Sequence, residues 1–241
     1  MSQAKHRLTA LGLGLSAALM LTALWAAGAQ AEAGATWKKN AVPITSGSVA
    51  VTGTLETGVN HPRLLTTFNG ALISILCEKF EIEDGLLLPE GKSLGNFLFD
   101  ECTTSINGVP EPQCDLVPHS GKTHEIETLV KDLIVLDKTV VGNEEGYDLF
   151  TPDNGTTTFV TLLYKKGTEC ILPAEISITG EFILRDCNNA FRTEAAVHLI
   201  KEAPASLFSS TGLKFGKAPA TIDGSINLFL VGGGNWSGSP G

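Results

Sequence analysis

A strict alternation of apolar and polar residues, repeated in several short segments, is the feature of this sequence that most limits its fold. Near the C-terminus, Ile222, Leu228 and Leu230 fall on one face of an extended chain, and the residues between them are mostly polar. Residues 160–164 and 175–184 alternate in the same way. A period of two residues is typical of half-buried strands in antiparallel sheets.

Other parts of the chain also favour strands over helices. Helical spacing fits only residues 129–137, whose Val and Ile content suits a strand as well. The pairs Asp84-Gly85 and Asn107-Gly108 are typical turn signals between strands. We therefore predict an all-β fold of about ten strands, an antiparallel β-sandwich or barrel that forms a single domain stapled by disulfides. The further expected strands are residues 48–55, 72–82, 94–102, 126–136 and 191–200.

The N-terminus has the layout of a secretory signal peptide. Lys5 and Arg7 precede an uncharged stretch over residues 8–25, which runs into the small-residue motif that ends at Ala31. The expected organisation is a signal peptide over residues 1–31 and a secreted domain over residues 32–241. No later apolar run is long enough to span a membrane, so no span is expected in the mature chain, which we place in the periplasm or at the cell surface.

The charge balance excludes two classes of partner. The chain has 26 Asp and Glu against 17 Lys and Arg, a formal net charge of −9, and removal of Lys5 and Arg7 with the signal makes it more acidic. Nucleic acids and anionic membrane surfaces attract basic proteins, so neither is an expected partner.

All five cysteines follow the signal, where an oxidising compartment favours disulfides over zinc ligation. A turn-rich stretch separates Cys102 from Cys114, and we expect it to bring them together as one bridge. A strand over residues 175–185 would hold Cys170 far from Cys187, so we expect Cys77 to pair with Cys170. Cys187 would then be free to link two copies of the chain.

The sequence carries no recognisable catalytic motif. No Gly-x-Ser-x-Gly elbow occurs, and His119 and His124, though close together, lack a third metal ligand at a defined spacing. An acidic segment offers the hard oxygen ligands of an extracellular Ca²⁺ site, although a solvated loop explains it more simply. The residues of this candidate site are Glu144, Glu145, Asp148 and Asp153.

Several landmarks resemble those of a group of uncharacterised secreted bacterial β-rich proteins. They are Trp37 soon after the signal, a strand over residues 97–102 that ends in Cys102, and Trp236 in a Gly-rich tail. The runs at residues 212–216 and 219–224, which lead into the last strand, belong to the same likeness. The resemblance implies a secreted β protein and supplies no catalytic residues.

These features favour a secreted or surface-associated protein with a structural or binding role toward a protein or glycan partner, and not an enzyme. Two alternatives remain open. One is an extracellular hydrolase whose site is assembled from distant loops, and the other is a module that binds or assembles with calcium.

Overall fold

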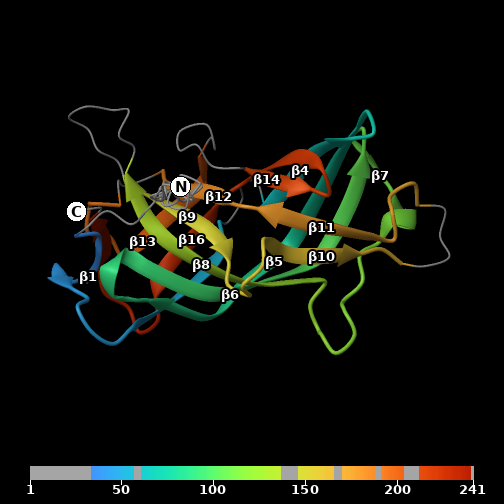
Figure 1. Ribbon diagram of the computed structural model, residues 1–241. Helices are drawn as coiled ribbons and strands as arrows, with labels where there is room; N and C mark the ends of the chain where they lie inside the picture. Colours follow the sequence, from blue (N-terminus) through green and yellow to red (C-terminus); the bar gives the residue numbers. More distant parts are fainter. Residues whose placement is uncertain are drawn as a thin grey trace, which may run out of the picture.

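The structure is a computed structural model that describes residues 34–56, 61–136, 146–165, 170–187, 191–203 and 212–239 (Figure 1). These residues form seventeen strands and two short 3-10 helices, η1 (Pro89–Gly91) and η2 (Pro112–Cys114), and include no α-helix. The predicted all-β antiparallel fold is confirmed, with more strands than the sequence indicated.

Eight strands form a closed antiparallel barrel. The ring closes because β6 pairs with β8 on one side and with β5 on the other. In ring order the strands are β5 (Ala71–Leu87), β3 (Val49–Leu55), β16 (Ile226–Leu230), β13 (Val197–Ala203), β12 (Phe182–Asp186), β9 (Gly146–Pro152), β8 (Ile126–Leu136) and β6 (Lys92–Ile106).

A second sheet lies beside the barrel and shares its two longest strands, β5 and β6 (Figure 1). One hydrophobic cluster runs through both parts, so they form one domain. In order, the second sheet contains β10 (Thr158–Leu163), β11 (Glu175–Gly180), β14 (Leu213–Phe215), β15 (Ala218–Asp223), β4 (Arg63–Phe68), the outer parts of β5 and β6, and β7 (Val109–Pro110).

The free edge of β10 is covered by the segment that follows η2. Val117 N–H donates to Leu163 O at 2.9 Å, and Lys165 N–H donates to Asp115 O at 2.9 Å. His119 Nε2 donates to Thr161 O at 2.6 Å. These bonds satisfy backbone groups that an open edge would expose to another chain.

Alternation of the inward residues changes phase where β5 and β6 leave the barrel. In β5 the buried positions are odd up to Cys77 and even from Phe80 to Ile82. In β6 the change occurs at Glu101, a non-glycine residue with φ of 54°. Each strand can therefore present an apolar face to the barrel along one part of its length and to the second sheet along the other.

The Asp84-Gly85 pair is not the turn that the sequence predicted. It forms a β-bulge inside β5, where the pairing with β6 shifts between Glu83 and Leu86. A Cβ on Gly85 would lie 2.3 Å from the carbonyl oxygen of Val51, so only glycine fits this close approach. The Asn107-Gly108 pair does form a turn, between β6 and β7.

The predicted disulfide pairing is wrong, although the four cysteines expected to form bridges do so. The bridges are Cys77–Cys102 and Cys114–Cys170, and Cys187 is free and exposed. The prediction ended a strand at Cys102, whereas β6 continues to Ile106 and places Cys102 directly opposite Cys77 in the ladder. The turn-rich stretch after β6 instead carries Cys114 across to the second sheet.

A small third sheet covers one end of the barrel and joins the two ends of the described chain. β1 (Thr36–Lys39) pairs with both β2 (Val42–Pro43) and β17 (Trp236–Ser239). Trp37 and Trp236 are each 1% exposed and pack with Phe191, which belongs to this cover and not to a strand. The strand predicted to begin at residue 191 therefore begins at Val197.

Candidate functional site

An apolar hollow lies where the barrel meets the second sheet. It has a volume of about 130 Å³ and is called the interior cavity below. Its walls come from strands of both sheets and are almost entirely apolar, because each strand turns alternate residues inward. Its aromatic lining consists of Phe80, Phe97, Phe99, Phe159 and Phe182, and aliphatic residues such as Val160, Leu162 and Ile178 complete it.

The aromatic rings hold one another in place around the interior cavity. The rings of Phe80 and Phe97 meet edge to face, with centroids 5.4 Å apart. The ring of Phe182 stacks on that of Phe150 at 5.1 Å and meets that of Phe159 at 5.3 Å. Such pairs prefer defined geometries, so the walls are largely formed before any ligand arrives.

The volume sets the size of molecule that fits without expansion. Cavities of about 150 Å³ lined by Leu, Ile and Phe stay dry and bind benzene or xenon. The interior cavity is similar in size and chemistry, so it can hold one aromatic ring or a short branched alkyl group.

Most polar residues that line the interior cavity lie next to the β15–β16 connection, and the exception is Thr128 on β8, whose hydroxyl donates to Phe159 O at 2.8 Å. Arg63, Glu202 and Ser225 lie next to this connection, with Lys201. Arg63 pairs with Asp223 through two hydrogen bonds of 3.0 and 2.6 Å, which hold the pKa of Asp223 below its usual range. The side chains of this pair are partly exposed, so this end of the cavity approaches the surface.

Glu202 differs from the other charged residues at this end because it points inward. It follows His198 and Ile200 at two-residue spacing along β13, and both of those side chains are buried. Its Oε2 accepts a hydrogen bond of 2.7 Å from the backbone N–H of Ile222. Burial raises the pKa of Glu202 to about 7, and the nearby charge of Asp223 acts in the same direction.

Two other clusters of polar side chains are candidate functional sites. The first lies inside the closed end of the barrel. Asp132 accepts a hydrogen bond from Ser93 Oγ, and His198 contacts Asp186 through Nδ1 at 2.5 Å. Burial raises the pKa of Asp132 to about 8, and burial and the charges of Asp132 and Asp186 raise that of Asp148.

The space beside these carboxyl groups measures only about 30 Å³, enough for about one water molecule. Trp37 and Trp236 line it, and both are buried in the cover over this end of the barrel. This polar cluster therefore has no room for a substrate, and we interpret it as part of the core.

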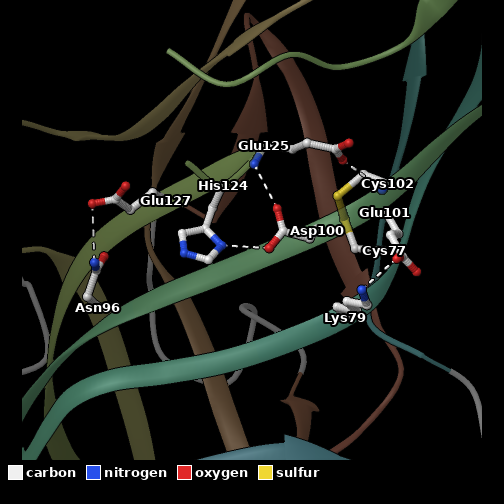
Figure 2. A network of polar contacts seen from close by, with 9 residues as sticks. All are labelled: Cys77, Lys79, Asn96, Asp100, Glu101, Cys102, His124, Glu125 and Glu127. Carbon is white, nitrogen blue, oxygen red and sulfur yellow. Dashed lines mark hydrogen bonds and ion pairs between the residues drawn. A yellow bond between two sulfur atoms is a disulfide. The ribbon is translucent and has the colours of Figure 1, made fainter. Parts of the chain in front are cut away.

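The second cluster is a network on the outer surface of β5 and β6, where Figure 2 shows Asp100 at the centre. Asp100 accepts hydrogen bonds from His124 Nδ1 at 2.6 Å and from Glu125 N–H at 3.1 Å, and the first raises the pKa of His124. Cys102 N–H donates to Glu125 at 2.7 Å, and Lys79 pairs with Glu101 at 2.6 Å (Figure 2).

This network borders a surface hollow of about 330 Å³. Its polar lining consists of Glu78, Lys79, Glu81, Asp100 and His124, and Leu55, Phe80 and Leu98 complete it. Asp100 and Lys79 already hold protein partners in it. The bonds join β5, β6 and the start of β8 beside the Cys77–Cys102 bridge, so we interpret the network as structural.

The structure describes two of the four predicted calcium ligands, Asp148 and Asp153, and places them in different surroundings. Asp148 is buried inside the barrel, whereas Asp153 is partly exposed and pairs with Lys131 at 3.5 Å. Glu144 and Glu145 lie outside the described residues. Across the described ranges, no group of three or more His, Cys, Asp or Glu residues is placed to hold a metal ion.

Neither Glu202 nor Asp132 was predicted as a site residue, yet the sequence carries a signal for each. Each is an acidic residue at an inward position of a strand, because Asp132 follows Val130 by two residues and Glu202 follows Ile200 by two. A carboxyl group at an apolar position of an alternating strand marks a buried charge.

Similarity to known proteins supplies no further information about the site. No family model, curated protein or solved structure matches this chain. In the part of the chain that the structure describes, no helix is long and apolar enough to cross a bilayer.

Proposed function

We propose that this protein is an exported binding protein that holds a small apolar molecule, about the size of one aromatic ring, in the interior cavity. The observation that carries the proposal is the cavity of about 130 Å³, walled by aromatic and aliphatic side chains from both sheets. Pockets with apolar walls and a few convergent polar groups are the usual form of small-molecule sites.

Export is supported by the signal-like N-terminal sequence and by two intramolecular disulfides, which persist in oxidising compartments. In such a compartment, a protein of this kind would take up a small apolar compound from its surroundings. The sequence favoured a protein or glycan as the binding partner, whereas the cavity supports a small molecule as the ligand.

The test is a titration of the purified domain with toluene, observed by NMR and by thermal melting. Toluene should shift the signals of residues that line the interior cavity and raise the melting temperature, since a ligand that binds only the folded state stabilises it. The absence of both effects up to the solubility limit of toluene would overturn the proposal.

A matched pair of variants ties the binding to this cavity. Val160 lies on β10 and lines the cavity, so Val160→Phe should fill it and abolish the toluene response. Val109 on β7 is 59% exposed, so Val109→Phe makes the same change outside the cavity and should leave the response intact. An unchanged response in Val160→Phe would place the toluene elsewhere.

A further inference from the structure

We infer that the interior cavity selects small apolar molecules that carry a protonated amine, and that the carboxylate of Glu202 holds this amine. This inference rests on the proposed function and names the ligand class of the same site. Its basis is the position of one inward-facing acid at the polar end of an otherwise apolar cavity.

The strand register fixes the direction of Glu202. Its cross-strand partner on β12 is Leu184, which is buried and also lines the cavity. Lys201, the preceding residue, is paired with the exposed Arg185 and so belongs to the outward-facing set. Alternation along β13 therefore directs the side chain of Glu202 inward and that of Lys201 outward, although both residues contribute to the cavity lining.

Glu202 has a hydrogen bond from the protein but no cation. Ile222 N–H donates to one of its oxygens at 2.7 Å. The guanidinium of Arg63 lies at the same end of the cavity but is engaged by Asp223 through two hydrogen bonds. Among the described residues, no Lys, Arg or His forms an ion pair with Glu202.

A partly buried carboxylate without a cation is costly, and a ligand that supplies the cation removes that cost. The raised pKa of Glu202, about 7, is consistent with this cost. A ligand with an ammonium group would donate a charge-assisted hydrogen bond to Glu202, while the ring of the ligand packed against the apolar walls. A carboxylate ligand would instead meet the like charge of Glu202, because Arg63 is already paired.

The charged groups around Glu202 set the expected pH dependence. Asp223 on β15 lies close enough to raise the pKa of Glu202, and Arg63 on β4 forms an ion pair with Asp223. Lys201 precedes Glu202 on β13, and Glu56 accepts a hydrogen bond from Ser225. Amine binding needs the ionised form of Glu202. Affinity for an amine should therefore rise as the pH increases through about 7, while affinity for a neutral ring should not change.

The experiment compares benzylamine, toluene and benzoate, which share one ring and differ in charge. At pH 8, benzylamine should bind at least about tenfold more tightly than toluene, the ratio expected for one hydrogen bond to a charged group. Benzoate should bind most weakly. Equal affinities for benzylamine and toluene, or tighter binding of benzoate, would overturn the inference and leave the proposed function standing. If none of the three binds, both the inference and the proposed function are wrong.

The isosteric variant Glu202→Gln should abolish the preference for benzylamine over toluene. The control Glu175→Gln removes an exposed carboxylate from β11 and should keep the preference. If Glu202→Gln does not fold, titration of the wild type at pH 6 and pH 8 still tests whether Glu202 binds the amine. A benzylamine-to-toluene ratio that does not increase over this range contradicts the role of Glu202.

Discussion

Asp132 on β8 and Asp148 on β9 lie on the same inner face of the barrel, where the charge of Asp132 raises the pKa of Asp148. Burial raises both pKa values, that of Asp132 to about 8. Burial therefore favours the protonated, uncharged form of both carboxyl groups, and a protein core accepts such groups more readily than two anions.

The first prediction concerns the pH dependence of stability. A carboxyl whose pKa is higher in the folded state binds its proton more tightly there, so its contribution to stability is greatest at low pH. That contribution is lost as the pH rises from about 4 to about 8. The variant Asp132→Asn replaces the neutral acid with a group of the same shape, so its melting temperature should fall less than that of the wild type between pH 5 and pH 8.

The control for this prediction is Asp153→Asn, which alters the partly exposed acid paired with Lys131. Its melting temperature should follow the pH slope of the wild type, because Asp153 lies outside the barrel core. Parallel slopes for Asp132→Asn and the wild type would show that Asp132 ionises normally in the folded protein.

A second prediction concerns the disulfides, whose connectivity peptide mapping under non-reducing conditions should identify as Cys77–Cys102 and Cys114–Cys170. Their bridged residues are 25 and 56 positions apart. In the chain-entropy model, removing them by paired Ala substitutions should cost about 3.5 and about 4 kcal/mol respectively. Denaturant unfolding measures both costs, and a clearly larger loss for the shorter loop would contradict this ranking.

A third prediction concerns Cys187, the free and exposed cysteine. One thiol per chain should react with an aromatic disulfide reagent under native conditions, and the variant Cys187→Ser should show none. Any covalent dimer on non-reducing electrophoresis should also disappear in this variant. More than one reactive thiol in the native wild type would mean that a bridge is not formed.

Particular residues show which features of the fold could be predicted from the sequence alone. Alternation identified strands such as β11 and β16, because each presents one face to the core and the other to solvent. The Asp84-Gly85 bulge was missed because Gly after a residue with positive φ marks turns and bulges alike. The pairing of Cys77 with Cys102 depends on the register of two long strands, which local patterns do not encode.

The interior cavity could not be predicted for a related reason. Its walls join residues far apart in the chain, such as Phe80, Phe159 and Leu213, and its volume depends on how two sheets meet. Glu202 was within reach of sequence reasoning, since a carboxyl group interrupts the inward set of His198 and Ile200. Its role as a ligand-binding group can be inferred only once the apolar cavity in front of it is known.

A crystal structure of residues 32–241 soaked with bromobenzene tests directly whether the interior cavity holds a small apolar ligand. We expect one anomalous bromine peak inside the interior cavity, among Phe97, Phe159 and Phe182. The same crystals grown from Val160→Phe should lack this peak. An empty cavity at saturating bromobenzene, or a peak only on the outer surface, would contradict the claim that this fold holds a small apolar ligand.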